Sequence, residues 1–211
     1  IAAMARSYQP GLLIVDRTVT GEYENYTTPE QQVPDKPLPF PWETCMTMGG
    51  SWSYVPGDQY KSATELIHLL IKIVSRGGNF LLNIGPGPDG DWDPEAYKRL
   101  EQIGDWMRLN GEAIYNSRPA APYSAGNLYF TRSKDEENSY AFCLADSTGQ
   151  WPATLQIPAG LSTLNNQYRL TGSITRLKTS RAGEQLLVHL PADLLKKVPR
   201  SHALVIRISK K

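Results

Sequence analysis

The chain has 211 residues, 40% of them hydrophobic, which suits one large domain or two small ones with a buried core. Its 22 basic and 21 acidic residues leave a net charge of +1 at pH 7, so composition provides no broad basic surface for nucleic acid or for an anionic membrane. We therefore expect a neutral substrate, no nucleic-acid partner and no membrane association.

The first segment contains a helix end, an apolar run and a long irregular stretch. Residues 1–6 have the pattern of a helix end with no N-cap before it, so we interpret the chain as the later part of a longer polypeptide. The apolar run at 11–16 predicts a short strand buried on both faces. Residues 17–60 form a stretch rich in Pro, Gly and aromatic residues, and a loop of this length is usually functional.

A well-buried helix is predicted next. Ser62 and Glu65 have the spacing of a capping box at its start. The residues of 66–74 are apolar on more than one face, which favours packing against a sheet. Gly77-Gly78 mark the end of the helix.

Residues 79–84 predict a second strand, apolar on both faces, that pairs in parallel with 11–16 through a right-handed crossover. Another helix is predicted from Asp93, its N-cap, to Asn110. Residues 1–118 thus have the alternating order of strands and helices that is typical of an α/β barrel or an open sheet.

The pattern changes near residue 119 to short runs in which apolar and polar residues alternate. Gly, Pro, Asn and Asp separate these runs, which indicates about seven antiparallel strands in a β-sandwich. We therefore predict a second domain over residues 119–211. The apolar positions of the predicted strands are Leu128, Phe130, Tyr140, Phe142, Leu144, Leu155, Ile157, Leu186, Val188, Leu190, Leu204, Ile206 and Ile208.

Glu30 is the candidate for acid–base chemistry. Glycoside hydrolysis needs two carboxyl groups across the scissile bond, and one of them must hold a proton near neutral pH. Burial among apolar groups raises the pKa of a carboxyl group and so favours that form. Glu30 lies among aromatic residues in the sequence, with Tyr26 before it and Phe40, Trp42 and Trp52 after it. These flat side chains suit a sugar ring.

Several linked motifs, in order along the first half of the chain, resemble the α-L-fucosidases of glycoside hydrolase family 29. The resemblance covers residues 5 to about 119. The motifs are Val15-Asp16-Arg17, Thr28-Pro29-Glu30, Trp42-Glu43-Thr44-Cys45, Ser51-Trp52-Ser53-Tyr54, the segment from Gly77 to Pro86 and the segment from Asn110 to Tyr115.

The resemblance implies the C-terminal part of a (β/α)8-like barrel followed by a β-sandwich, and retaining hydrolysis of terminal α-L-fucose. It implies that Glu30 is the catalytic acid/base, that Arg17 contacts the sugar and that Trp52 packs on its methyl side. Glu43 is the competing candidate for the acid. We assign Glu43 to the substrate-binding residues. A structural role, in which Glu43 forms a hydrogen bond to the backbone or to Arg17, is the alternative.

The attacking aspartate of such enzymes has no match here, and none of His68, His189 and His202 matches the fucose-binding histidines of the family. We therefore expect activity only with a complementary N-terminal polypeptide that carries the nucleophile, on a fucosylated glycan. No metal and no other cofactor is expected. The substrate class suggests a secreted or periplasmic location. The alternative is a non-catalytic carbohydrate-binding or scaffold protein whose sandwich presents aromatic residues.

Overall fold

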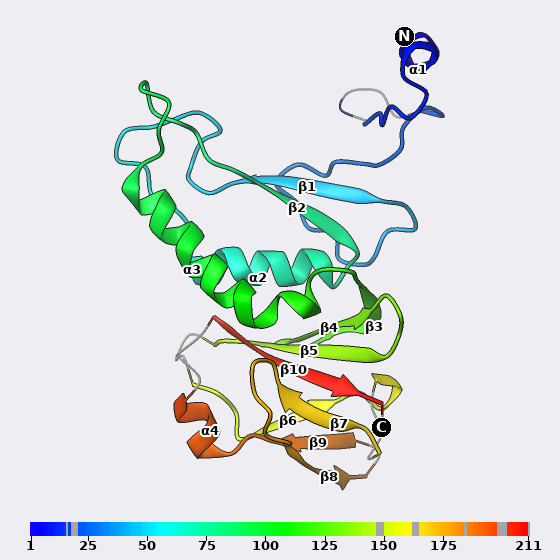
Figure 1. The fold of residues 1–211 in the computed structure, drawn as a ribbon, viewed down its shortest axis with the longest axis vertical. Coiled ribbons are helices and arrows are strands. Elements are labelled where there is room, and N and C mark those ends of the chain that lie inside the picture. Colours follow the sequence, from blue (N-terminus) through cyan, green and yellow to red (C-terminus); the bar gives the residue numbers. More distant parts are fainter. Residues whose placement is uncertain are drawn as a thin grey trace.

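The N-terminal half is organised around two parallel strands, β1 (Trp42–Thr47) and β2 (Gly78–Asn83), joined by helix α2 (Ala63–Val74) (Figure 1). The computed structural model describes residues 1–15, 17, 21–146, 150–161, 165–183, 185–197 and 202–210. Helix α3 (Pro94–Asn110) lies beside α2, and the 3-10 turn η1 (Gly111–Ala113) follows it. Helix α1 (Ala2–Tyr8) lies at one end of the molecule and has no buried residue.

The strand predicted at 11–16 is wrong. Within the described residues of this run, Val15 makes one isolated parallel bridge to Tyr26, Leu13 is 69% exposed, and no strand forms. Asp16 lies outside the described residues. A strand buried on both faces needs neighbours on either side, and the described part of the chain places only the Tyr26 segment there.

Strand β2 therefore pairs with β1, which lies within the stretch predicted as loop. Its run of Trp42, Thr44 and Met46 carries aromatic and β-branched residues, which favour strands. The Pro-rich flanks of this run hid that signal. The prediction that 79–84 pairs with another strand in parallel is thus confirmed, but the partner strand is β1 and not residues 11–16.

The predicted starts of α2 and α3 are confirmed. The Ser62 side chain accepts a hydrogen bond from the backbone N–H of Glu65, and the Glu65 side chain accepts one from the backbone N–H of Ser62. Asp93 caps α3 by accepting from the Glu95 N–H at 2.8 Å. These bonds satisfy backbone donors that otherwise have no partner in the first turn.

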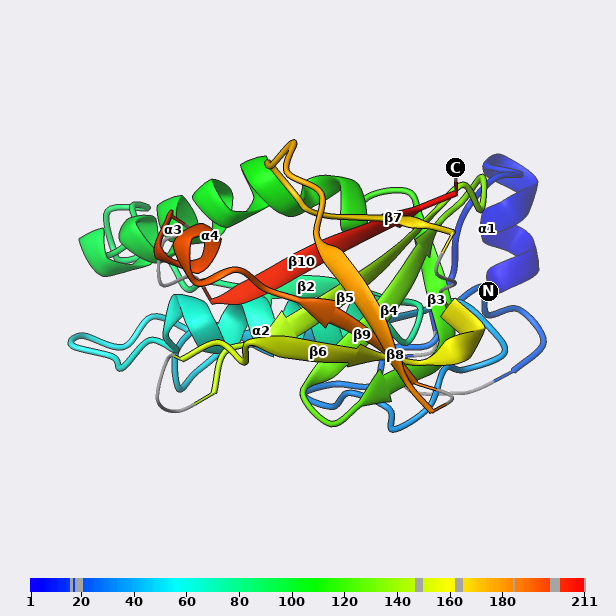
Figure 2. The same cartoon turned by 90° about the horizontal axis from the view of Figure 1, so that it is seen from below.

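The C-terminal half is an antiparallel β-sandwich, as predicted (Figures 1 and 2). One sheet has the order β3-β4-β5-β10-β7 and the other the order β6-β9-β8. Their strands are β3 (Ser117–Ala125), β4 (Leu128–Ser133), β5 (Asn138–Leu144), β6 (Thr154–Ile157), β7 (Gln167–Leu170), β8 (Lys178–Ala182), β9 (Gln185–His189) and β10 (Ala203–Ser209). The 3-10 turn η2 (Ala159–Leu161) and helix α4 (Ala192–Lys197) lie in connections between strands.

Three of these strands were not predicted, and all three lie at sheet edges, where the usual pattern is relaxed. Strand β3 contains Pro119 and Pro122, and an edge strand tolerates proline because one side needs no ladder hydrogen bonds. Strand β8 is polar and borders only β9. Strand β7 is short and contributes the buried Tyr168 and Leu170.

Two hydrophobic layers hold the five-stranded sheet. Its inner face packs against the smaller sheet, with Leu204, Ile206 and Ile208 of β10 in that core. The alternate residues Ala203 and Val205 face the other way, toward helices α2 and α3. Because strand side chains alternate, one strand serves both layers. The division into domains at residue 119 stays a prediction.

The indole of Trp106 strengthens the second layer. It is 4% exposed, and its Nε1 donates a hydrogen bond to the backbone oxygen of Ala203 at 3.0 Å. The buried helix residues Ile67 and Ile71 lie in the same cluster as Phe142 of β5. The α/β half and the sandwich therefore share a continuous apolar contact.

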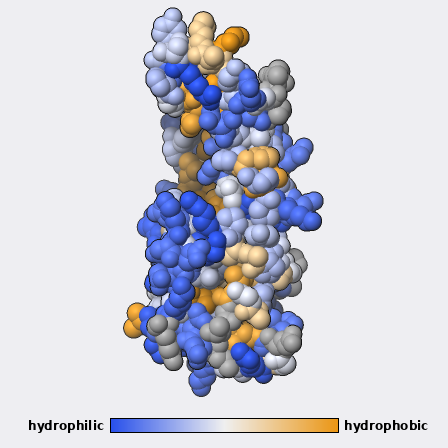
Figure 3. All heavy atoms as spheres, turned by 90° about the vertical axis from the view of Figure 1, so that its right-hand side faces the viewer, coloured by the Kyte–Doolittle hydropathy of each residue, from blue (hydrophilic) through white to orange (hydrophobic). Residues whose placement is uncertain are grey.

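Hydrophobic side chains also reach the surface. Figure 3 shows orange atoms in the upper part of the molecule, which carries α1 and the parallel sheet. Large exposed hydrophobic residues of this part are Met4, Tyr8, Leu13, Tyr23, Phe40, Trp52, Tyr54, Val55 and Leu81. No helix in the described ranges combines the length and hydrophobicity needed to cross a bilayer.

A pair of histidines at the contact between α2 and β10 makes stability depend on pH. His68 Nε2 donates to the backbone oxygen of His202 at 2.6 Å, and His202 Nδ1 lies 2.8 Å from the Thr64 hydroxyl. Burial lowers the pKa of both histidines, and the His68 charge lowers the pKa of His202 further. The folded state therefore disfavours their protonation.

We predict that the free energy of unfolding falls as the pH drops below the ordinary histidine pKa of about 6.5, because the unfolded chain then binds more protons than the folded one. The contribution of the two neutral histidines to stability is fully present above pH 6.5. It is lost as the pH falls toward the lowered pKa values that His68 and His202 have in the folded state. Urea unfolding from pH 8 to pH 5 measures it. The His68→Gln, His202→Gln double variant should lose part of this slope, whereas His189→Gln serves as the control. An unchanged slope in the double variant would contradict the prediction.

Candidate active site

The face of the parallel sheet that points away from α2 carries the candidate site. Phe80 and Leu82 pack with Leu66 of α2, so the residues between them point to the opposite face. On that face Glu43 lies opposite Asn79, and Cys45 lies opposite Leu81. The pleat of two strands thus places a carboxylate, a thiol and an apolar side chain together.

The segment that carries Glu30 runs along the edge of β1. Thr27 bridges Trp42 in parallel, and the Glu43 N–H donates to the Thr27 oxygen at 3.0 Å. Further on, the Gln31 N–H donates to the Cys45 oxygen at 3.0 Å, and Gln31 has a φ of 57°. These backbone bonds on either side of Glu30 fix its position next to Cys45.

Arg17 joins Glu30 to Cys45. Its Nη2 lies 2.9 Å from Glu30 Oε2, and its Nη1 lies 3.7 Å from Cys45 Sγ. The contact with the Cys45 sulfur, followed by the nearby Glu30 charge, raises the pKa of Arg17. The side chains of Arg17 and Glu30 are 52% and 44% exposed, so this is a surface ion pair.

Trp52 lies on a loop whose backbone is held by hydrogen bonds with Asp58 and Lys61. The Gly50 N–H donates to both carboxylate oxygens of Asp58, at 3.1 and 3.0 Å, and Lys61 Nζ donates to the Thr47 oxygen at 2.7 Å. At the end of β2, a Cβ on Gly85 would lie 2.5 Å from the Tyr54 nitrogen. Only glycine permits this close approach of the loop backbone.

These elements together line a pocket of about 460 Å³. All four residues predicted from the sequence line it, and so do residues for which no role was predicted. The lining residues are Val15, Arg17, Tyr26, Thr28, Glu30, Glu43, Cys45, Trp52 and Leu81. The structure thus brings the candidates together, while their chemical roles stay predictions.

The surroundings of Glu30 differ from the expected apolar enclosure. Of the aromatic residues expected around it, Tyr26 and Trp52 line the pocket, whereas Trp42 is buried and donates from Nε1 to the Arg76 oxygen near the end of α2. Phe40 is 47% exposed and does not line the pocket. Proximity in sequence misled here because neighbouring residues of β1 point to opposite faces.

Leu81 is a pocket residue that was not predicted from the sequence. Leu81 was assigned to a buried strand but is 52% exposed at the pocket. In a strand, Leu81 faces the opposite side from Phe80 and Leu82. All three residues are apolar, so no alternation of polar and apolar residues revealed that Leu81 lies on the pocket side. Cys45 is buried, with its sulfur facing Arg17.

No cluster of potential metal ligands accompanies the pocket among the residues that the structure describes. Throughout the described part of the chain, no three His, Cys, Asp or Glu side chains lie close enough together to hold a metal ion. The groups available for chemistry in the pocket are therefore two carboxyl groups, a guanidinium, a thiol and a hydroxyl, beside an indole and a phenol ring.

Comparisons with known proteins agree on one family. The family model for alpha-L-fucosidase matches residues 1–112. The alpha-L-fucosidase of Dictyostelium discoideum is 38% identical over 121 residues, which are 56% of this chain and 26% of that protein. The human plasma alpha-L-fucosidase is 35% identical over 142 residues, which are 64% of this chain and 29% of that protein.

A solved structure extends the likeness to the sandwich. Alpha-L-fucosidase isoenzyme 1 from Paenibacillus thiaminolyticus superimposes with a TM-score of 0.86 at 25% identity, covering 100% of this chain and 52% of its own. The chain thus spans about half of that structure and a smaller part of the two curated relatives. With a family match over more than half of its residues, this chain belongs to the α-L-fucosidase family.

Proposed function

We propose that this chain is the C-terminal portion of a retaining exo-α-L-fucosidase and supplies its general acid/base, Glu30. The observation that carries the proposal is the pocket in which Glu30 lies with Arg17, Glu43 and Trp52. Family membership supports fucose as the sugar. An indole beside polar groups is a common surface for binding the apolar side of a sugar.

The proposed reaction has two steps. In the first, Glu30 protonates the departing glycosidic oxygen while a carboxylate attacks the anomeric carbon and forms a glycosyl-enzyme ester. In the second, Glu30 removes a proton from water while the water oxygen attacks the anomeric carbon, which breaks the ester bond, releases fucose and restores the carboxylate. Both carboxyl groups end in their starting states, so no cofactor is consumed.

We propose that the attacking carboxylate is an aspartate of a complementary N-terminal polypeptide. Among the residues that line the pocket, the carboxylates are Glu30 and Glu43. Glu43 projects from β1 beside the Arg17–Cys45 contact, where we propose that it binds the substrate. Leu81 at the pocket and Leu13, two residues before the lining residue Val15, are exposed apolar groups that suit a surface covered by a partner. We propose that this partner completes a (β/α)8-like barrel.

We propose that Arg17 exchanges its contact with Glu30 for contacts with the sugar. An exposed ion pair contributes only about 0–1 kcal/mol, so substrate hydroxyl groups can replace it at little cost. We propose that this exchange frees Glu30 to hold the transferred proton. The ion pair holds both side chains beside each other at the pocket.

The alternative, a binding module built on the sandwich, has less support. Tyr140 and Tyr168, two of the aromatic residues available for a sugar platform, are 3% and 2% exposed and belong to the cores. Trp151 is partly buried against the sandwich core. Tyr140 and Tyr168 thus stabilise the fold and do not form a surface platform.

The acid/base role predicts that Glu30→Gln lowers activity about 10²- to 10⁴-fold, because glutamine cannot transfer the proton. The test mixes the purified chain with the complementary N-terminal polypeptide and follows hydrolysis of an aryl α-L-fucoside. Glu43→Gln is the matched control and should raise KM more than it lowers kcat. Full activity of Glu30→Gln would refute the assignment, and a larger loss of kcat in Glu43→Gln would move the role to Glu43.

The retaining mechanism makes a separate prediction about stereochemistry. Two successive displacements at the anomeric carbon should release α-L-fucose first. Proton NMR of the reconstituted enzyme at early times distinguishes this product from the β anomer before mutarotation mixes them. Initial release of β-L-fucose would contradict a covalent intermediate.

The close approach of the Ser53–Tyr54 backbone to Gly85 predicts a specific effect on sugar binding. Gly85→Ala should displace the Ser53–Tyr54 backbone and with it Trp52, so KM for the fucoside should rise several-fold with a smaller change in kcat. Gly160→Ala, which has open space around the new Cβ, is the control. An unchanged KM in Gly85→Ala would show that Trp52 is not positioned by this contact or does not bind the sugar.

A further inference from the structure

Three arginines lie side by side on one sheet of the sandwich, far in sequence from the candidate active site. Arg207 of β10 is directly opposite Arg169 of β7, and Arg169 also bridges Arg176. Directly opposed residues on antiparallel strands have Cα atoms roughly 4.5 to 5.5 Å apart, and their side chains share a face. Like charges in such pairs are destabilising, so this arrangement costs the fold some stability.

The arginines lie on the outer face of the sheet. Ile206 and Ile208, which flank Arg207, are in the sandwich core, and so are Tyr168 and Leu170, which flank Arg169. Alternation therefore directs both guanidinium groups away from that core, and both arginines line one pocket with Glu112 of turn η1.

A pocket of about 280 Å³ opens between this face and η1. Its volume is below the range of about 300 to 1,000 Å³ found for sites of drug-sized ligands, so it fits one small group. The lining residues are Glu112, Gln167, Arg169, Leu170, Thr171, Gly172, Ser173, Arg207 and Ser209. Two of them are cationic and one is anionic, so the lining has an excess of positive charge.

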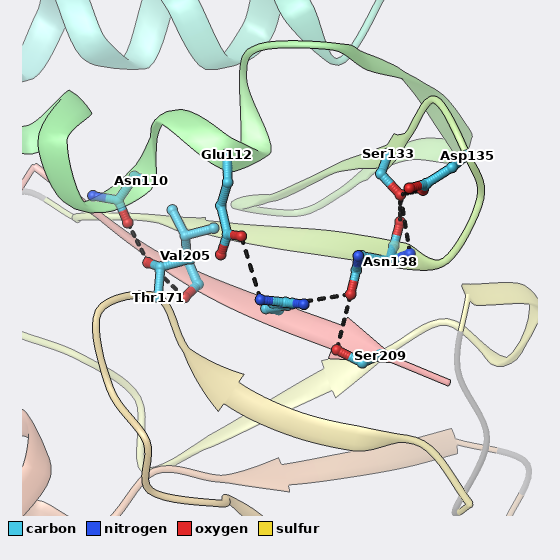
Figure 4. Close-up of polar contacts among 9 residues, drawn as sticks. Asn110, Glu112, Ser133, Asp135, Asn138, Thr171, Val205 and Ser209 are labelled. Carbon is cyan, nitrogen blue, oxygen red and sulfur yellow. Dashed lines mark hydrogen bonds and ion pairs between the residues drawn. The ribbon is translucent and has the colours of Figure 1, made fainter. Parts of the chain in front are cut away.

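The carboxylate of Glu112 neutralises only part of the positive charge of Arg169 and Arg207. Glu112 Oε2 lies 3.4 Å from Arg207 Nη1, and Asn138 Oδ1 accepts from Arg207 Nε at 2.9 Å (Figure 4). Both side chains of the Glu112–Arg207 pair are more than 40% exposed, at 41% and 43%. This pair is therefore weak and can rearrange around a ligand.

Arg169 has donor capacity that the described residues do not use. Its Nη2 donates to Gln167 Oε1 at 3.2 Å, whereas its Nε is buried with no partner in the described part of the chain. A buried donor without an acceptor costs free energy. An acceptor that enters the pocket beside Arg169 would remove this cost.

The turn after β7 adds hydroxyl groups to the pocket. Ser173 Oγ accepts from the Thr175 N–H at 3.1 Å, which leaves its own hydroxyl proton free to donate. The Thr171 hydroxyl donates to Asn110 Oδ1 at the end of α3, and the Thr171 N–H donates to the Val205 oxygen at 3.0 Å (Figure 4). These bonds hold the turn, which includes Gly172 with a φ of +71°, against the sheet.

We propose that this pocket binds a tetrahedral oxoanion, a sulfate or phosphate group. Two guanidinium groups on neighbouring strands can each donate two parallel hydrogen bonds to such a group, and charge-assisted bonds of this kind are the stronger ones. The Ser173 hydroxyl supplies a further donor to the remaining oxygens. The group comes either as a free ion or as an ester on a larger molecule such as a sulfated glycan.

The test titrates the ¹⁵N-labelled chain with sodium sulfate, sodium phosphate and a sulfated oligosaccharide at constant ionic strength, and follows the backbone amide signals. The amides of Thr171, Gly172 and Ser173 should shift and saturate with an oxoanion but not with chloride. Tighter binding of the sulfated oligosaccharide than of inorganic sulfate identifies an ester as the ligand. Equal binding of the two identifies the free ion.

Charge-matched variants separate a built site from general attraction to arginine. Arg169→Gln should weaken binding about tenfold or more, whereas Arg181→Gln, which removes an exposed arginine of β8, should not change it. Glu112→Gln removes the competing carboxylate and should strengthen binding several-fold. This gain tests the proposal even if Arg169→Gln fails to fold.

Three results would overturn the proposal. One is an absence of saturable shifts at the Thr171–Ser173 turn, and another is an equal loss of affinity in Arg169→Gln and Arg181→Gln. The third is unchanged or weaker binding in Glu112→Gln.

Discussion

The parallel pairing of β1 with β2 is the constraint on which the N-terminal half depends. Strand side chains alternate, so one register assigns Phe80 and Leu82 to the core under α2 and assigns Glu43, Cys45 and Leu81 to the pocket. A shift of one residue would exchange the two sets and bury a carboxylate. The apolar contact with α2 therefore also fixes the chemistry of the opposite face.

The site is built from segments that reach the strand pair independently. Backbone bonds tie the Glu30 segment to the edge of β1, and the loop of Trp52 is braced by Asp58 and by the close approach at Gly85. Arg17 then connects Glu30 to Cys45 through contacts that are partly exposed. Backbone hydrogen bonds therefore hold the segments at β1, whereas the contact between Arg17 and Glu30 is an exposed ion pair.

Strand β10 has a corresponding role in the sandwich. Ile206 and Ile208 fill the core between the two sheets, while Val205 packs toward α2 and α3. Arg207 belongs to the outer set, but it lies beyond the helices, where the face opens into the pocket with Arg169. Thus the same alternation that couples the sandwich to the helices also places two like charges side by side.

The sequence by itself determined the elements with local signals: α2 and α3 from the Ser62–Glu65 box and the Asp93 cap, and the sandwich from alternating apolar residues. It also identified Glu30, Arg17, Glu43 and Trp52 as candidates, because their motifs are short and contiguous. Only the tertiary structure decided that β1, not residues 11–16, pairs with β2, and that the four candidates line one pocket. It alone also set Arg169 beside Arg207, since strand partners and shared faces depend on packing between segments far apart in sequence, for which a local pattern carries no signal.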